Sequence, residues 1–329
     1  MNKRNYTLDL LKVIALMAIM LAHVKPKGYI FQLRNFDVPL MIMISVWLSL
    51  RSIKSEKFNY MKYIYSRIKR LIKPTWIFLT IYFLISYFKS QTISIKDIIM
   101  SYSLIDGIGY VWVIRIYIYV AMVTPIIYKI YNKLKKWQIT PLFGFTYGIY
   151  IFLIDRLSAI NGISKTLITA TIIDFIAYSF VVFISIIIFN LEKKDIAKLG
   201  FLFGLIFSLL ALKNGFIQTQ YFKYPLRLYY LSYAFSVSIY LYLFVDKLNK
   251  DKKLRHFRMI DFISKNSMWI YLWHIMYIST VNKLFLNNDI GYIYRFSLVV
   301  LLALVTTYIQ VFVISSFKKI VNMYYKRNW

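Results

Sequence analysis

The first apolar segment, residues 8–24, carries three ionisable side chains: Asp9, Lys12 and His23. Such groups are expensive inside a bilayer and usually face a protein interior or a water-filled cavity. Lys12 and His23 are eleven residues apart. In an α-helix this spacing leaves them only about 20° apart around the axis and roughly 16 Å apart along it. We therefore expect them to share one helix face, with Asp9 close enough to Lys12 to pair with it.

Imidazole titrates near neutral pH, so His23 is suited to be a general base, and Lys12 adds a positive charge on the same face. In the alternative, Asp9 is a helix-terminal residue, Lys12 extends toward polar headgroups and His23 lies at the membrane–water interface. The shared face favours a functional site for Lys12 and His23. For Asp9 alone the helix-terminal role is favoured.

Arg115 is a further charge inside an apolar segment and needs a partner there. Trp112 precedes it by one turn and is placed to stack on the guanidinium. Asp174 is either its counter-ion or an ordinary residue of the outer membrane interface. A role in function or in holding the structure is favoured for Arg115. His274 lies in "IYLWHIM", and a single histidine among aromatic residues is more often a structural hydrogen-bonding group than a catalyst.

The stretch "SRIKRLIKP" at 66–74 contains Arg67, Lys69, Arg70 and Lys73. Arginine forks match phosphate geometry, so a phosphate-binding site is one interpretation. The other is that a basic loop fixes membrane orientation and contacts anionic lipid.

The composition shows what must position these residues. Of 329 residues, 60% are hydrophobic and 19% aromatic, which indicates a polytopic membrane protein. Backbone groups in lipid must be satisfied internally, so we expect an all-α fold with about ten transmembrane helices. The expected segments are 8–24, 37–50, 72–88, 108–128, 139–154, 167–189, 199–212, 228–245, 260–282 and 293–316. Two of them, 37–50 and 199–212, are short for a span of about 20 residues. No long hydrophilic stretch separates domains, so residues 1–329 are expected to form one transmembrane domain.

The formal charge of +29 is explained by orientation. If the N-terminus is cytoplasmic, 27 of the 42 Lys and Arg residues lie in the cytoplasmic segments and 12 in the opposite ones. The cytoplasmic segments are 1–7, 51–73, 129–138, 190–198, 246–259 and 317–329. Excess Lys and Arg stay inside, so we expect a multi-pass protein of the cell membrane, surrounded by lipid, with both termini cytoplasmic. The scattered charge does not favour a nucleic-acid partner. Without Cys or metal-spaced His clusters, no metal site is expected.

The Lys12–His23 spacing resembles the first-span motif of the acyltransferase 3 family of integral membrane acyltransferases, in which the basic residue is typically Arg. Similarities follow in order along nearly the whole chain. In "VPLMIMISVWLSL" at 38–50, Val46 stands where the family commonly has Gly after Ser45. The others are "SRIKRLIKP" at 66–74, "WVIRIYIYVAMVTP" at 112–125, "YPLRLYYLSYAFSVS" at 224–238 and "ISKNSMWIYLWHIMY" at 263–277.

The resemblance implies a stand-alone membrane O-acyltransferase without a fused esterase-like domain. Its co-substrate would be an acyl-CoA, most often acetyl-CoA, bound on the cytoplasmic side, and no cofactor would stay bound. The acceptor would be a hydroxyl of a cell-surface or lipid-linked glycan, which makes the protein an O-acetyltransferase.

The chemistry then assigns roles to the residues. We expect His23 to act as general base or as acyl acceptor, and Lys12 or Arg115 to stabilise negative charge on the carbonyl oxygen. Arg67 and Arg70 are expected to bind the phosphates of CoA. Further candidates for substrate binding or structural support are Asp9, Ser45, Trp112, Tyr230 and His274.

Two alternatives remain open. A transporter or flippase for a lipid-linked glycan or a small anion would use the intramembrane charges as its substrate or ion site, and it predicts inverted repeats and paired broken helices. A member of the other large class of membrane acyltransferases would use a histidine in a later span, which here is His274. Alanine substitution of each histidine separates the two acyltransferase readings.

Overall fold

The computed structural model describes residues 5–89, 92–108, 110–157, 159–250, 257–285 and 291–327, with side chains of the last helix described as far as residue 317. Within these ranges the regular structure is entirely helical. The elements are α1 (Tyr6–His23), α2 (Gly28–Leu33), α3 (Asp37–Ile53), α4 (Tyr60–Phe88), α5 (Ile95–Tyr102), α6 (Trp112–Tyr131), α7 (Lys136–Leu157), α8 (Gly162–Ile168), the π-helical turn η1 (Thr169–Ile173), α9 (Asp174–Asn190), α10 (Lys193–Lys213), the 3₁₀ turn η2 (Thr219–Phe222), α11 (Leu228–Lys250), α12 (Arg258–Phe285) and α13 (Tyr292–Arg327).

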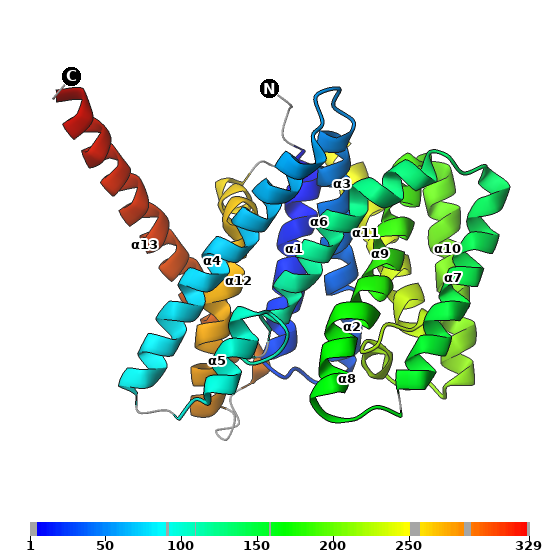
Figure 1. Cartoon of the computed structure of the whole chain (residues 1–329), viewed down its shortest axis with the longest axis horizontal. Helices are drawn as coiled ribbons and strands as arrows, with labels where there is room; N and C mark the ends of the chain where they lie inside the picture. The colour runs from blue at the N-terminus through cyan, green and yellow to red at the C-terminus, as the bar shows by residue number, and fades with distance from the viewer. Residues whose placement is uncertain are drawn as a thin grey trace.

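The long helices form one bundle with α1 and α3 near its centre (Figure 1). Helix α1 packs against α3, α11 and α12, and α3 also packs against α6 and α9. Helices α4, α7, α10 and α13 are less buried and expose large apolar side chains. Exposed apolar faces of this kind suit a protein whose surroundings are lipid.

Each of the ten expected segments corresponds to a helix, and the helix of the segment at 108–128 begins later, at Trp112. In the described part of the chain, nine helical stretches are long and apolar enough to cross a membrane, and they include Gly28–Ile53 and Gly162–Asn190. The tenth expected segment, 260–282, is α12, which is long enough to span but carries more polar side chains. The protein is therefore an all-α polytopic membrane protein.

The two segments that looked short have different explanations. The segment at 199–212 extends at its N-terminal end and becomes α10, Lys193–Lys213. The segment at 37–50 is preceded by the short helix α2, so the second candidate span is broken between Leu33 and Asp37. Asp37 begins α3, and its Oδ1 accepts a hydrogen bond from the Val38 amide at 2.7 Å. A carboxylate at this position is stabilised by the unpaired N–H groups of the first helical turn.

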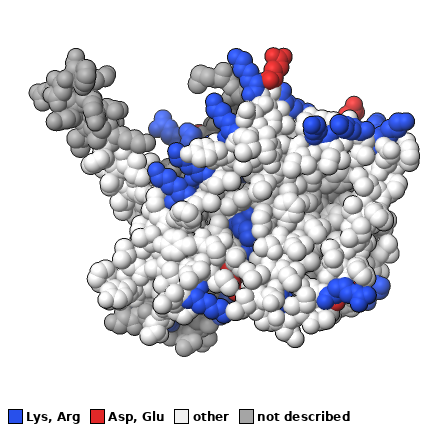
Figure 2. All heavy atoms as spheres, viewed as in Figure 1, with Lys and Arg blue, Asp and Glu red and all other residues white. Residues whose placement is uncertain are grey.

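Helix α1 begins and α13 ends at the same end of the bundle (Figure 1). Lys and Arg side chains gather at this end, and a smaller group lies at the opposite end (Figure 2). The surface between them is mostly uncharged in this view. This distribution has the asymmetry that the sequence predicts, although residues 251–256 of the basic segment 246–259 lie outside the described residues.

Candidate active site

Two cavities lie along the face of α1 that carries Lys12 and His23. The first, called the basic cavity, has a volume of about 210 Å³ and is lined by Lys12, Leu16 and Ile19 of α1. The second, called the histidine cavity, has a volume of about 300 Å³ and is lined by Ile19, Ala22 and His23. The prediction that Lys12 and His23 share a face toward a buried space is therefore confirmed.

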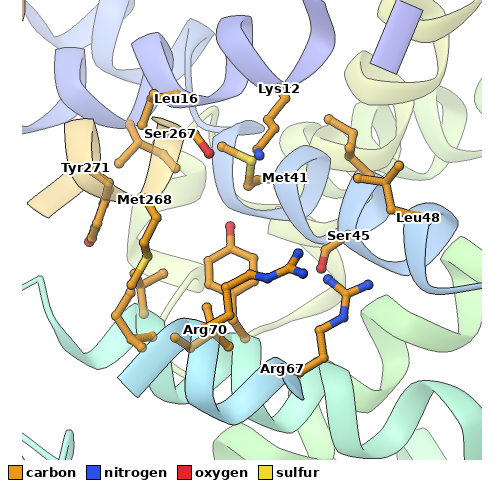
Figure 3. A pocket seen from close by; sticks show the side chains of 16 residues that line it. Lys12, Leu16, Met41, Ser45, Leu48, Arg67, Arg70, Ser267, Met268 and Tyr271 are labelled. Carbon is orange, nitrogen blue, oxygen red and sulfur yellow. The ribbon is translucent and has the colours of Figure 1, made fainter. Parts of the chain in front are cut away.

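The basic cavity takes its positive charge from two helices (Figure 3). Lys12 reaches in from α1, and Arg67 and Arg70 reach in from α4, with their guanidinium groups directed toward Ser45 of α3. Arg67 is held in place, because its Nη2 donates to Ser49 Oγ at 3.3 Å and its guanidinium lies 5.3 Å from the centre of the Tyr63 ring. Three cationic side chains therefore line one pocket, and contacts hold Arg67 in its orientation.

The remainder of the basic cavity is largely apolar. Side chains that line it without charge include Leu16, Ile44, Leu48, Leu71, Val113, Ile114 and Met268. The hydroxyl-bearing residues Tyr117, Ser267 and Tyr271 are also part of the wall. A cationic group of side chains next to an apolar chamber suits a ligand with an anionic head and a flexible, less polar arm.

Lys12 and Asp9 both bind Ser264 of α12. The Lys12 Nζ donates to the Ser264 carbonyl oxygen at 2.8 Å, and the Ser264 Oγ donates to Asp9 Oδ1 at 2.5 Å. Asp9 is not among the described residues that line either cavity, whereas Lys12 is. Asp9 thus joins α1 to α12 beside Lys12.

His23 and His274 form a hydrogen-bonded pair. The Nδ1 of His23 lies 2.9 Å from the Nε2 of His274, and the Nδ1 of His274 is bonded to the Tyr271 carbonyl oxygen. A carbonyl oxygen only accepts, so the His274 Nδ1 must carry a hydrogen, and in the neutral ring the His274 Nε2 is then an acceptor. It follows that His23 donates from Nδ1 and keeps its lone pair on Nε2. His274 is fully buried and does not line either cavity among the described residues.

Further contacts fix the end of α1 that carries His23. The carbonyl oxygen of His23 accepts a hydrogen bond from Asn282 Nδ2 at 3.1 Å, and the carbonyl oxygen of Val24 accepts one from Arg295 Nη2 at 3.1 Å. These donors satisfy carbonyls that a helix end leaves unpaired. The ring of Tyr110 packs on the His23 imidazole with 3.8 Å between ring centres. Burial raises the pKa of the Tyr110 phenol, so this group keeps its proton beside the imidazole.

The two cavities meet at three side chains. Ile19 of α1, Val113 of α6 and Tyr271 of α12 line both of them. The Tyr271 hydroxyl donates to the Tyr110 carbonyl oxygen at 2.5 Å. Tyr110 has a positive φ of 84°, an uncommon conformation for a residue with a side chain. The bond from Tyr271 therefore ties the junction of the cavities to the loop that presses on His23.

A comparison with protein families decides the class of protein. A family model described as an acyltransferase domain, that of the acyltransferase 3 family, matches residues 5–315. The chain belongs to the acyltransferase 3 family. No curated protein and no solved structure is significantly similar to it. The resemblance seen in the sequence is therefore confirmed, and the protein is a membrane acyltransferase, which leaves the transporter interpretation without support.

In this acyltransferase, Arg115 is held by the bundle rather than directed into a cavity. Its Nη1 donates to the carbonyl oxygens of Leu104 and Ile105 at 2.6 and 2.8 Å, and its Nη2 donates to Asp174 Oδ2 at 2.7 Å. Asp174 is thus the counter-ion that the sequence suggested. Arg115 does not appear among the described residues lining either cavity. It joins the loop before α6 to the first residue of α9.

The expected stacking of Trp112 on Arg115 is wrong. The Trp112 ring packs edge-on against Tyr224, with ring centres 5.3 Å apart and planes at 90°. The guanidinium instead turns toward two carbonyl oxygens and a carboxylate, which form stronger, charge-assisted hydrogen bonds. Trp112 and Tyr224 both line the histidine cavity of the acyltransferase.

Of the remaining predicted residues, one lines a cavity and one is buried in the protein core. Ser45 lines the basic cavity. Tyr230 is fully buried and lies behind the wall, where the Lys223 Nζ sits 5.5 Å from the centre of its ring. Among the residues that the structure describes, no group of three or more His, Cys, Asp or Glu side chains is arranged to hold a metal ion.

Sequence reasoning missed several residues of the histidine cavity in this acyltransferase. Arg34, Asp37 and Lys223 line it, and each is buried. In the sequence, Arg34 and Lys223 are ordinary charges of short loops, which membrane orientation explains. The signal that could have found the site is Asp37, an acidic residue at the start of an apolar segment within three residues of an arginine.

Proposed function

We propose that this membrane acyltransferase is an acyl-CoA-dependent O-acyltransferase that transfers an acyl group, in the first instance acetyl, to a hydroxyl of a cell-surface or lipid-linked glycan. The observation that carries the proposal is the junction of the two cavities. A pocket with three cations and a pocket with an oriented histidine share Ile19, Val113 and Tyr271 as walls. On this proposal the donor and the acceptor meet at these shared residues.

The donor side is assigned by charge. We place the end of the bundle where α1 begins in the cytoplasm, because short loops rich in Lys and Arg remain there. Acyl-CoA is made in the cytoplasm and carries phosphate groups, which Arg67 and Arg70 at the basic cavity would bind in bidentate fashion. The pantetheine arm would then extend along the apolar wall toward Ile19 and bring the thioester to the junction.

The chemistry at the junction uses the free nitrogen of His23. A sugar hydroxyl is a poor nucleophile at neutral pH until a base removes its proton. In the proposed step the His23 Nε2 takes that proton while the hydroxyl oxygen forms a bond to the thioester carbonyl carbon. The bond from carbon to sulfur then breaks, and the CoA thiolate leaves and takes the proton from His23. The products are the glycan ester and free CoA.

His274 would act through His23. Its Nε2 accepts from the His23 Nδ1 and so keeps the lone pair of His23 on Nε2, and it can stabilise the imidazolium that forms during transfer. Lys12 brings a positive charge into the basic cavity from the α1 face that also carries His23, and would help to stabilise negative charge on the bound donor. Arg115, held outside both cavities, is proposed to position α6 and α9 around the site.

The test uses purified full-length protein, acetyl-CoA labelled on the acetyl carbonyl, and envelope glycan as acceptor. Release of free CoA and transfer of label to glycan are measured for wild type and for a His23→Ala variant shown to be folded. Transfer by wild type and its loss in the variant support the proposal. Equal transfer by both proteins would rule out His23 as the base. Label that stays on the wild-type protein without acceptor, but not on the variant, would identify an acyl-His23 intermediate in place of direct transfer.

A further inference from the structure

The wall of the histidine cavity contains three buried charged side chains that the proposed reaction does not use. Arg34, Asp37 and Lys223 all line the cavity and have relative exposures of 5%, 1% and 3%. They come from the break between α2 and α3, from the first residue of α3, and from the loop between η2 and α11. Buried charges are retained where they are paired or where they bind something.

The charges in this group do not cancel. Asp37 Oδ2 accepts from Arg34 Nη1 at 2.7 Å, and Asp37 Oδ1 accepts from Lys223 Nζ at 3.2 Å. One carboxylate thus faces two cations. Arginine stays protonated at any physiological pH, and the acceptors around Lys223 Nζ suit an ammonium group. The cavity wall therefore carries a net positive charge, which favours an anionic occupant.

Several polar atoms of the same wall can form further hydrogen bonds: some have no partner, and one has fewer partners than it can bind. The buried Nε of Arg34 and the buried Oε1 of Gln220 have no hydrogen-bond partner among the described residues. Lys223 Nζ has two acceptors in the described structure, Asp37 Oδ1 and Asn35 Oδ1, and an ammonium group has three hydrogens to donate. Buried polar groups are normally satisfied. Two spare donors and one spare acceptor on side chains that line a single cavity therefore indicate a polar ligand.

A purely structural role does not account for the two cations. The loops on which they lie are already joined by neutral groups, because Asn35 Nδ2 donates to Thr219 Oγ1 at 2.8 Å and the Thr219 amide donates to Gln32 Oε1 at 2.9 Å. These bonds would tether the loops without placing charge at the cavity. The neutral tether can also hold the loops in place when the charged group is altered.

The aromatic residues of the wall complete the recognition chemistry. Trp112 and Tyr224 line the cavity edge-on to each other, and Tyr110 lines it next to His23. Aromatic faces pack on the apolar faces of sugar rings, while polar groups fix the orientation of the ring. We propose that the histidine cavity binds an acidic sugar of the acceptor, whose carboxylate or phosphate is held by Arg34 and Lys223 while Gln220 accepts from one of its hydroxyl groups. The inference builds on the proposed function only in naming this ligand as the acceptor.

Binding of small probes to the purified full-length protein tests the site without any transfer reaction. Methyl glucoside, methyl glucuronoside and glucose 6-phosphate differ in charge at the same ring position. Their affinities are measured by titration calorimetry for wild type, Lys223→Gln, Lys223→Arg and the control Lys165→Gln, which removes the charge of an exposed lysine outside the cavity. Thermal unfolding of each variant checks that it is folded.

We expect wild type to bind at least one acidic probe about tenfold or more tightly than methyl glucoside. The acidic probe that binds more tightly shows whether the site takes carboxylate or phosphate. Lys223→Gln should lose this preference, while Lys223→Arg and Lys165→Gln should keep it. Equal binding of all three probes by wild type, or an unchanged preference in folded Lys223→Gln, would overturn the inference. The transfer assay with labelled acetyl-CoA is a separate experiment. If no label is transferred but the protein still prefers the acidic probe, the ligand is not the acceptor of the reaction, and the binding site itself still stands.

Discussion

The Nδ1 atom of His23 and the Nε2 atom of His274 lie 2.9 Å apart, so the two histidines that competed for the catalytic role in the sequence belong to one hydrogen-bonded pair. Of the two, His23 lines the histidine cavity, whereas His274 is not among the described residues lining either cavity, and its second nitrogen is bonded to the Tyr271 carbonyl. The donors and acceptors of the pair are therefore fixed: His23 donates to His274, His274 donates to the Tyr271 carbonyl, and the Nε2 of His23 keeps its lone pair. This arrangement predicts different outcomes for substitution of the two residues.

His23→Ala should lower kcat by about 10²–10⁴-fold, because it removes the base. His274→Ala should cost less, about 10–100-fold, as is typical when a group that orients a histidine is lost. His274→Gln should recover part of the loss, since an amide oxygen can accept from the His23 Nδ1. Steady-state kinetics on folded variants provides the measurement. The double alanine variant should be no slower than His23→Ala, and additive losses would mean that the histidines act independently.

Substitution of the two arginines of the basic cavity should weaken binding of the acyl-CoA donor and leave binding of the acceptor unchanged. Arg67→Ala and Arg70→Ala are each expected to raise KM for acyl-CoA by about tenfold, which corresponds to about 1.4 kcal/mol of lost binding. Lys69 is the matched control, because it lies on the same helix but does not line the cavity among the described residues. Kinetics at varied acyl-CoA concentration gives the answer. An equal rise in KM for Lys69→Ala would mean that the general charge of the segment matters, and not the cavity.

The junction of the cavities can be narrowed by one substitution. Val113→Phe adds bulk where Val113 lines both cavities, so it should abolish transfer while weakening acyl-CoA binding far less, because Arg67 and Arg70 are unchanged. Val123→Phe is its control, because Val123 is a buried valine of the same helix that lines neither cavity among the described residues. Both changes overpack the core and should cost about 1–3 kcal/mol of stability. Label transfer and acyl-CoA binding are measured side by side. Similar loss of transfer in both variants would point to overpacking alone.

Arg115 and Asp174 should contribute to stability more than to catalysis. Their side chains are 9% and 15% exposed, and breaking a buried ion pair by removing one partner costs about 3–5 kcal/mol. Asp174→Asn should therefore lower the thermal unfolding temperature of the detergent-solubilised protein. Asp195→Asn, which breaks the exposed pair with Lys198, should change it little. A large fall in kcat with unchanged unfolding would instead give Arg115 a direct role in the reaction.

The periodicity and the residue types of the sequence were sufficient to predict the helices and the residues on one face of the site. Helical geometry alone placed Lys12 and His23 on one side of α1, because both positions lie in a single uninterrupted helix. Asp174 was identifiable as a partner for Arg115, since a charge inside an apolar segment needs a counter-charge nearby. The hydrogen bond between His23 and His274 was not predictable, because it depends on how α1 packs against α12 across 251 residues of sequence.

The wall of the histidine cavity shows why the remainder could not be predicted. Arg34 and Lys223 stand in loops, where positive charge has the ordinary explanation of membrane orientation. Their shared contact with Asp37 joins positions up to 189 residues apart, as Arg34 and Lys223 meet through one carboxylate. Loop charges become a site only when the fold buries them together. No local spacing rule describes that event.

The acidic-sugar site should weaken as pH rises, because Lys223 loses its charge earlier than an exposed lysine. Burial lowers the pKa of Lys223, Asp37 opposes this effect, and Arg34 adds to it. The ammonium is present below this lowered pKa and is lost as pH rises through it. The Tyr224 phenol beside it keeps its own proton, since desolvation and the Asp37 carboxylate raise its pKa. Affinity for methyl glucuronoside or glucose 6-phosphate, whichever binds more tightly, should therefore fall on the alkaline side while Arg34 stays charged.

The Lys223→Arg variant tests whether deprotonation of Lys223, and not of another group, causes the loss of affinity at alkaline pH. A guanidinium does not deprotonate in this range, so the variant should bind the acidic probe with little pH dependence. Affinities of wild type and Lys223→Arg are compared by calorimetry between neutral pH and about pH 9.5, below the ordinary pKa of exposed lysines of about 10.4. Parallel decline in both proteins would mean that another group titrates. A flat profile in both would mean that Lys223 keeps its proton throughout, with Asp37 outweighing the effect of burial.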